Sequence, residues 1–309
     1  MRTALVFPGQ GAQRVGMGKD IYENSSIARE MFQRAGECTG IDFETLIFEG
    51  PEATLMQTVN LQPAITLINL TTWEILRKET DNISLAYVLG HSLGEISAIY
   101  AAGSLDFEST LQLVMQRGRY MQEAAENNPG SMLAVLRISS DELQALIKES
   151  GQEIDIANYN GLEQTIISGQ KEEIEQFRLF LQEHGVKKTL PLKVSGPWHS
   201  RHMESAQRKF ADYLKNIRIQ DARIPVISNI TARPSISGKE ITENLIQQIT
   251  GSVHWTESIQ YLTNKEIMHY IECGPGNILS GLINRINGSL QTYSVNSYEA
   301  IHSLKQQLH

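Results

Sequence analysis

The chain has 309 residues, of which 41% are hydrophobic and 20% charged, a composition typical of a globular protein with one large domain or two smaller ones. Its formal net charge of −8 argues against nonspecific nucleic-acid binding, and its two cysteines argue against a disulfide framework or a structural zinc site. No apolar stretch reaches the length of a membrane span, and the first apolar run is too short for a signal peptide, so we expect a cytoplasmic protein.

Apolar runs of strand length alternate with helical patterns, which predicts an α/β architecture with a largely parallel sheet. The first part of the chain predicts a strand over 4–7, a helix over about 62–78 with Pro63 in its first turn, a strand over 85–89 and a helix over 95–102. The segment GHSLGE, residues 90–95, therefore lies where a strand passes into a helix.

The order of predicted helices and strands changes in the middle of the chain. Residues 131–194 predict strand, helix, strand, strand, helix and strand in that order, which is the ferredoxin-like βαββαβ pattern. Further α/β elements follow, including a strand near 224–230 and a helix near 240–249. We therefore predict a discontinuous larger domain over 1–127 and 198–309, with a small ferredoxin-like domain over 128–197 inserted in it.

Residues 90–94, Gly-His-Ser-Leu-Gly, match the G-x-S-x-G nucleophile elbow, in which a tight turn lifts the serine hydroxyl above the strand end. Ser92 is the candidate nucleophile. The backbone N–H of Leu93, at the start of the next helix, could stabilise a developing oxyanion. A plain glycine-flanked turn is the alternative, and the strand before and helix after favour the elbow.

A second glycine-rich loop, FPGQGAQ at 7–13, also follows a strand. Its spacing is neither that of the P-loop nor that of the dinucleotide fingerprint. The glycines on either side of Gln10 allow close approach of the backbone to a substrate, so the Gln10 N–H is a candidate second oxyanion donor.

Five motifs stand in order along the chain: FPGQGAQ, GHSLGE, QRG at 116–118, GPWHSRHM at 196–203 and ECGPGNIL at 272–279. Together they resemble the malonyl-CoA:acyl-carrier-protein transacylase family over essentially the whole chain. The resemblance implies an α/β-hydrolase-like domain with a ferredoxin-like insert, in agreement with the pattern of elements. The sequence after Trp198 is more similar to discrete, trans-acting polyketide synthase acyltransferases than to the housekeeping fatty-acid enzyme.

Among eight histidines, His199 follows Gly196-Pro197 just beyond the small domain, where it could project into a cleft. The resemblance makes it the catalytic base. No Asp or Glu stands out as a third member of a triad. In the family a glutamine backbone carbonyl orients the histidine, and the matching position is Gln248, although Gly251-Ser252 departs from the family pattern after it.

The resemblance also implies substrate-binding residues. Arg117 would bind the free malonyl carboxylate with its planar fork, whereas Arg119 would point about 200° around the helix. Trp198 stands where malonyl-selective members carry phenylalanine, and a larger indole predicts malonyl over methylmalonyl. His91 and Asn160 are expected to line the cleft.

The implied reaction moves malonyl from malonyl-CoA to the phosphopantetheine thiol of an acyl carrier protein through a Ser92 acyl-enzyme, with no cofactor or metal. We expect a monomer that binds neither nucleic acid nor membrane. The alternatives are a housekeeping fatty-acid transacylase, a serine hydrolase that releases free acid, and a non-catalytic module that keeps the fold. A basic segment containing Lys187, Lys188, Lys193, Arg201, Arg208 and Lys209 could dock the carrier.

Overall fold

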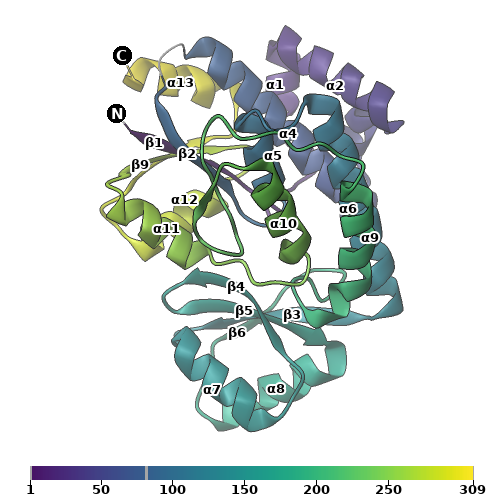
Figure 1. Cartoon of the computed structure of the whole chain (residues 1–309), viewed down its shortest axis with the longest axis vertical. Helices are drawn as coiled ribbons and strands as arrows, with labels where there is room; N and C mark the ends of the chain where they lie inside the picture. Colours follow the sequence, from purple (N-terminus) through teal and green to yellow (C-terminus); the bar gives the residue numbers. More distant parts are fainter. Residues whose placement is uncertain (1, 81–82, 309) are drawn as a thin grey trace.

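A six-stranded sheet forms the centre of the computed structural model, which describes residues 2–80 and 83–308 (Figure 1). Its strand order is β10-β9-β1-β2-β7-β8, and every neighbouring pair is parallel except the edge pair β7 and β8. The strands are β1 (Thr3–Phe7), β2 (Leu85–Gly90), β7 (Val226–Ile227), β8 (Pro234–Ser235), β9 (His269–Cys273) and β10 (Gln291–Val295).

Helices cover both faces of this sheet, so its central strands are apolar on both sides. Along β1, Leu5 and Phe7 belong to one hydrophobic cluster and Ala4 and Val6 to another, as the alternation of side chains across a strand requires. The helices packed around the sheet are α1 (Lys19–Asn24), α2 (Ser26–Thr39), α3 (Glu52–Leu55), α4 (Thr58–Glu79), α5 (Gly94–Ala101), α6 (Phe107–Asn127), α9 (Glu204–Leu214), α10 (Gly238–Gln248), α11 (Trp255–Asn264), α12 (Ile278–Ile286) and α13 (Tyr298–Leu308), with a π-helical turn at Thr45–Glu49 and a 3₁₀ turn at Arg201–Met203.

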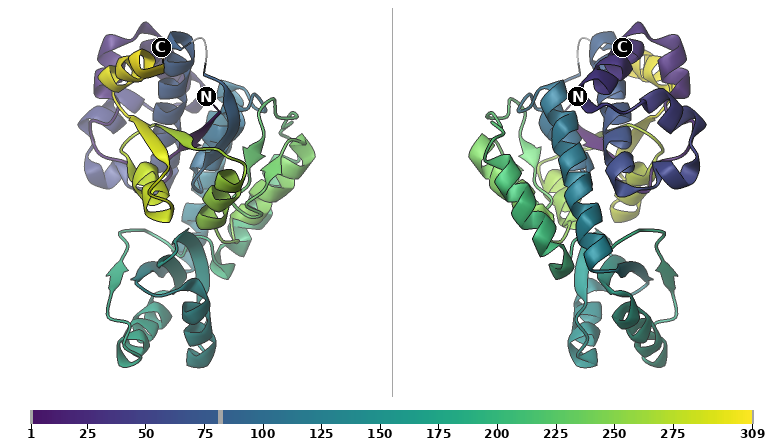
Figure 2. Two further views of the ribbon diagram at one scale, coloured as in Figure 1. Left: turned by 90° about the vertical axis from the view of Figure 1, so that its left-hand side faces the viewer. Right: turned by 90° about the vertical axis from the view of Figure 1, so that its right-hand side faces the viewer.

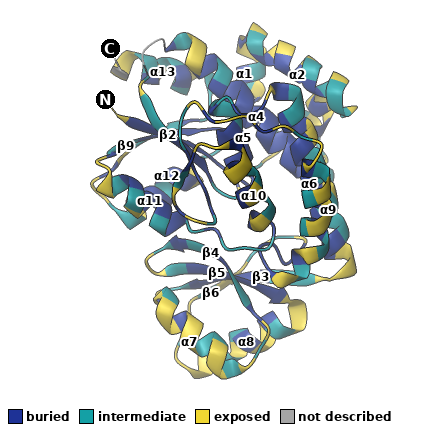
Figure 3. Ribbon diagram, viewed as in Figure 1, coloured by how far each residue is buried: buried dark blue, intermediate teal, exposed yellow. Residues whose placement is uncertain are grey.

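A second, antiparallel sheet of four strands, in the order β4-β5-β3-β6, lies at the end of the molecule away from both termini (Figure 2). Its elements follow the predicted order of the middle segment. They are β3 (Gly130–Leu136), α7 (Ser140–Ser150), β4 (Asp155–Gly161), β5 (Gln164–Gln170), α8 (Lys171–Glu183) and β6 (Thr189–Pro191). Figure 3 shows that α7 and α8 expose one side to solvent and bury the other against the strands.

Two predicted boundaries were wrong. Helix α4 begins at Thr58, so Pro63 lies inside the helix instead of in its first turn. The helix continues across Pro63 because sixteen of its residues are buried, and packing outweighs the lost backbone hydrogen bond. The last strand predicted within 131–194 is short, Thr189–Pro191, and ends at a proline, which has no N–H to donate to a neighbouring strand. No helix in the described residues is both long and apolar enough to cross a bilayer.

Candidate active site

Ser92 lies on a tight turn between β2 and α5, at the carboxyl end of the central sheet. Its φ of 50° is in the left-handed region, which is uncommon for a residue with a side chain and is typical of strained functional turns. A Cβ on Gly94 would lie 2.0 Å from the carbonyl oxygen of Phe7, and one on Gly90 would lie 2.0 Å from the Gly94 backbone. Both positions require glycine, so the G-x-S-x-G spacing is what allows this turn to form.

The loop after β1 packs directly against the Ser92 turn. The His91 N–H donates to the Phe7 carbonyl over 3.1 Å, and a Cβ on Gly9 would lie 2.4 Å from the His91 carbonyl oxygen. Gln10, next to Gly9, is therefore brought to the same strand ends as Leu93. Within residues 2–80 and 83–308, neither the Gln10 N–H nor the Leu93 N–H donates a hydrogen bond.

His199 contacts the serine hydroxyl. Its Nε2 lies 2.7 Å from Ser92 Oγ, and its Nδ1 lies 2.9 Å from the Gln248 carbonyl oxygen and 3.0 Å from that of Gly251. Because both carbonyls can only accept, Nδ1 carries the proton and Nε2 is free to accept the serine proton. Gln248 ends α10, where backbone carbonyls lack partners within the helix, which explains why its oxygen is available.

Burial and the positive charge of Arg117 lower the pKa of His199 to about 3. The imidazole is therefore neutral at neutral pH, which is the form that a general base requires.

Arg117 is wholly buried on α6, beside the serine. Its Nη2 donates to Gln248 Oε1 over 2.9 Å and to Ser92 Oγ over 3.3 Å, and its Nη1 donates to Gln62 Oε1 over 2.9 Å. Arg119 is exposed, as helical geometry predicts. Burial lowers the pKa of Arg117 to about 10, so it stays charged at neutral pH and can attract an anion to Ser92.

His91 and Asn160 link the serine turn to the second sheet, since His91 Nε2 lies 2.7 Å from Asn160 Oδ1. Burial lowers the pKa of His91, whose ring contacts Asn160 and not the Ser92 hydroxyl. Trp198 is buried, with its indole ring over Gly196. The structure thus brings Ser92, His199, Arg117 and Gln248 into direct contact. Trp198 instead packs in the hydrophobic core beside Gly196.

Sequence reasoning missed three residues that hold this cluster together. Asn229 accepts from the Ser92 N–H over 2.6 Å and donates to the Gly90 carbonyl over 2.7 Å, so it clamps the turn. Gln62 orients Arg117, and Glu95 is a buried carboxyl beside Gln248. Asn229 could have been found from its position near the end of the strand predicted at 224–230, because the strand ends of a parallel sheet meet at one edge.

Cavities adjoin the cluster on two sides. One is lined by Gln10, His91 and Asn160 together with apolar residues of α12. The other, of about 470 Å³, borders His199, Gly251 and polar residues of β4 and α9. Substrate groups can therefore approach Ser92 between the two sheets.

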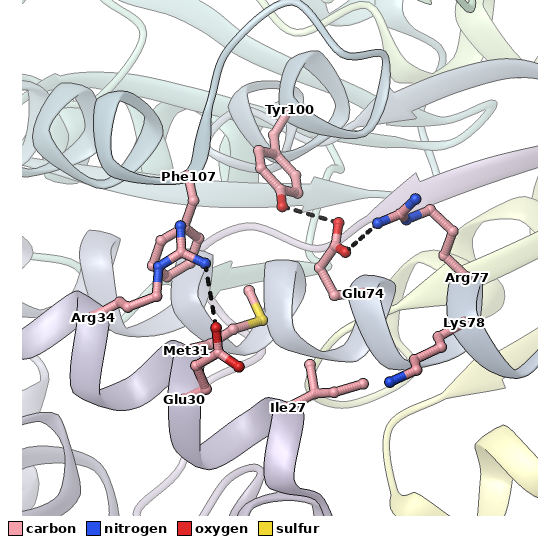
Figure 4. A pocket seen from close by; sticks show the side chains of 9 residues that line it. All are labelled: Ile27, Glu30, Met31, Arg34, Glu74, Arg77, Lys78, Tyr100 and Phe107. Carbon is pink, nitrogen blue, oxygen red and sulfur yellow. Dashed lines mark hydrogen bonds and ion pairs between the residues drawn. The ribbon is translucent and has the colours of Figure 1, made fainter.

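A separate cavity of about 430 Å³, beyond the far end of α5, is shown in Figure 4. Several of its polar groups pair with one another: Glu74 accepts from Tyr100 over 2.9 Å and from Arg77 over 2.6 Å. The described residues contain no group of His, Cys, Asp and Glu side chains arranged to hold a metal ion.

Comparison with known proteins agrees with this geometry. Residues 4–287 match the model of the acyl transferase domain family. The chain is 37% identical over 313 residues to the malonyl CoA-acyl carrier protein transacylase of Bacillus subtilis, covering 99% of this chain and 98% of that protein. It is 34% identical to the protein of the same name from Haemophilus influenzae, with the same coverage.

Solved structures give the same result. The malonyl-CoA:ACP transacylase of Synechocystis is 38% identical, with a TM-score of 0.90 over 98% of this chain and 100% of that one. A malonyl-transacylase in complex with its type II polyketide synthase acyl-carrier protein is 32% identical, with a TM-score of 0.95 over 99% of this chain and 100% of that one. The chain belongs to the malonyl-CoA:acyl-carrier-protein transacylase family of acyl transferase domains.

Proposed function

We propose that this protein transfers malonyl from malonyl-CoA to the phosphopantetheine thiol of an acyl carrier protein. The observation that carries the proposal is the contact of one hydroxyl with both a base and a buried cation: Ser92 Oγ lies 2.7 Å from His199 Nε2 and 3.3 Å from Arg117 Nη2. A nucleophile beside a buried guanidinium suits an acyl group that carries its own carboxylate.

In the first half-reaction, His199 Nε2 takes the proton of Ser92 as Oγ attacks the thioester carbonyl carbon. The N–H groups of Gln10 and Leu93 donate to the oxyanion. The C–S bond then breaks, His199 returns its proton to the departing coenzyme A thiolate, and malonyl remains as an ester on Ser92.

In the second half-reaction, His199 takes the proton of the carrier thiol, and its sulfur attacks the Ser92 ester. The C–O bond breaks, and the proton returns to Oγ. Neutral carbonyls of Gln248 and Gly251 hold the histidine, so no carboxylate of a triad is placed against the malonyl anion. His91 and Asn160 line the cleft, and the two substrates supply all the atoms of the reaction.

The domain division follows from the same arrangement. We assign an α/β-hydrolase-like catalytic domain to 1–127 and 198–309, supported by the parallel sheet and the Ser92 elbow, and a ferredoxin-like domain to 128–197, supported by the β4-β5-β3-β6 order. We also propose a cytoplasmic location, consistent with the free thiols of Cys38 and Cys273. That the protein is a monomer stays a prediction.

A serine hydrolase of the same family is the second candidate, and product analysis separates the two. We expect malonyl-CoA consumption to depend on added phosphopantetheinylated carrier protein, with malonyl-carrier as the product. Equal consumption without carrier, with free malonate as the product, would show a hydrolase. One similar structure is a type II polyketide synthase acyl-carrier protein in complex with its malonyl-transacylase, and the same transfer reaction would also serve fatty-acid synthesis.

Trp198 is predicted to favour malonyl over methylmalonyl. A single methyl group is worth about 1–3 kcal/mol in a pocket, so we expect methylmalonyl-CoA to load Ser92 at least about tenfold more slowly. Loading rates by rapid quench with each acyl-CoA give the ratio, and Trp198→Phe should reduce it. Equal rates for both substrates in the unmodified protein would refute this role.

The structure alters the predicted carrier-docking surface. Arg201 is paired with Asp155, Lys209 with Glu123 and Arg208 with Glu204, so these three cations already have partners. Lys187, Lys188 and Lys193 are exposed, and they form no ion pair with the described residues.

We therefore expect Lys188→Glu with Lys193→Glu to slow transfer to the acidic carrier several-fold at low salt while sparing self-acylation by malonyl-CoA. The two half-reactions are measured separately, with exposed Lys19→Glu as a matched control. An equal loss in both half-reactions would rule out this docking surface.

A further inference from the structure

Glu95 is a carboxyl side chain in the first turn of α5, and only 2% of its surface is exposed. A buried carboxyl is costly unless it is hydrogen-bonded and its charge is compensated. The proposed reaction assigns it no part, since it contacts neither Ser92 Oγ nor His199. Its position three residues after the nucleophile nevertheless places it directly behind the site.

One oxygen of Glu95 accepts two hydrogen bonds from opposite sides of the cluster. Gln248 Nε2 donates to Oε2 over 2.6 Å, and the Asn229 backbone N–H donates to the same atom over 3.1 Å. Gln248 orients both the base, through its carbonyl, and Arg117, through Oε1. Asn229 clamps the Ser92 turn through its side chain.

The Gln248 amide has only one arrangement that satisfies its neighbours. The Ser92 carbonyl and the Glu95 carboxylate are both acceptors, and Gln248 Nε2 donates to both, at 3.0 Å and 2.6 Å. Oε1 then faces Arg117, which has only donors. Losing the acceptor at position 95 would leave the Asn229 backbone N–H without its partner and would leave the Gln248 Nε2 with the Ser92 carbonyl as its one acceptor.

We propose that Glu95 is a positioning residue that fixes the nucleophile turn, the base and the carboxylate anchor relative to one another through the two hydrogen bonds accepted by its Oε2. This inference rests on the proposed malonyl transfer. A displacement of about 1 Å in such a cluster can cost about 10²-fold in rate.

Glu95 also supplies the negative charge that acts on Arg117. The hydrogen-bond acceptors of Arg117 are neutral, and among the described residues Glu95 is the carboxylate that stabilises its charge. Burial raises the pKa of Glu95 to about 7, against the opposing effects of Gln248, Asn229 and Arg117.

Of the elements packed against this turn, α6 contributes Arg117, the β2 turn contributes His91, and the loop that follows β6 contributes His199. The charged residues of α4 lie beside Tyr100, at the other end of α5. Above pH 7, an ionised Glu95 should therefore partly offset the attraction of Arg117 for malonyl.

The test compares two substitutions of similar size. Glu95→Gln keeps an oxygen that can accept both hydrogen bonds, whereas Glu95→Met removes the acceptor without leaving a large cavity. We expect Glu95→Met to slow Ser92 acylation by about 10²-fold with both malonyl-CoA and acetyl-CoA, and Glu95→Gln to stay within about fivefold. Circular dichroism and thermal melting check folding, and formation of the adduct by the unmodified protein checks the proposed function in the same assay.

Equal acylation rates for Glu95→Met and Glu95→Gln would overturn the positioning role. If Glu95→Met does not fold, Glu95→Gln still tests the positioning role: it keeps both hydrogen bonds, so a loss of about 10²-fold in its acylation rate would overturn that role. The pH profile of Glu95→Gln then tests the effect of the Glu95 charge on Arg117. The KM of this variant for malonyl-CoA should equal that of the unmodified protein at pH 6 and fall several-fold below it at pH 8, with no change for acetyl-CoA. Curves that coincide over the whole pH range would show that Glu95 does not act on the anchor.

Discussion

Replacing His199 with alanine is expected to lower the rate of Ser92 acylation by about 10³-fold, because the serine hydroxyl would lose the base that lies 2.7 Å away. Malonyl-CoA binding should change little, since Arg117 is held by Gln62 and Gln248 and not by the histidine. Single-turnover acylation monitored by mass spectrometry measures the rate, and exposed His184→Ala is the matched control.

The pH profile provides a second test of this base. With a pKa of about 3, His199 stays neutral as pH falls through 6.5, where an ordinary histidine gains its proton. The rate of acetyl loading on Ser92 should therefore be flat between about pH 5.5 and 8 and fall only under strongly acidic conditions. A halving of the rate near pH 6.5 would show that His199 titrates normally and that burial does not control it.

Replacing Arg117 with alanine is expected to change the acyl preference of the site. Two charge-assisted hydrogen bonds to a carboxylate are worth about 3–6 kcal/mol together, so kcat/KM for malonyl-CoA should fall by about 10²- to 10⁴-fold. Acetyl-CoA has no carboxylate, and its kcat/KM should stay within about tenfold. Competition between the two substrates, read as the masses of the two adducts, measures the ratio directly.

Two controls accompany this experiment. Arg119→Ala removes a neighbouring exposed arginine and should leave the ratio unchanged. Arg117→Lys keeps a positive charge but loses the planar fork, so it should recover only part of the malonyl preference. An Arg117→Ala protein that still prefers malonyl by the original factor would contradict the anchor role.

Much of the fold could be predicted from the sequence because the relevant signals are local. The apolar run of β1 and the glycines around Ser92 each depend on a few neighbouring residues. The start of α4 could not be predicted, since Pro63 is a strong local signal for a helix start and burial against α6 overrides it.

Only the site residues that lie in recognisable sequence motifs could be predicted. Ser92, His199 and Arg117 lie in recognisable patterns, and the structure brings them into contact. Asn229 and Glu95 lie far apart in sequence and meet because β2 and β7 are neighbouring strands. Gln248, the last residue of α10, contacts the same Glu95 oxygen. An acidic residue is common in the first turn of a helix, so Glu95 in the first turn of α5 needed no further role. The sequence therefore did not indicate its burial or its two hydrogen bonds.

Intact-protein mass spectrometry after mixing with malonyl-CoA, followed by addition of phosphopantetheinylated carrier protein, tests the central claim most directly. We expect one malonyl adduct that is absent from Ser92→Ala and that moves to the carrier thiol when carrier is added. No adduct with malonyl-CoA, or an adduct that persists in Ser92→Ala, would contradict it.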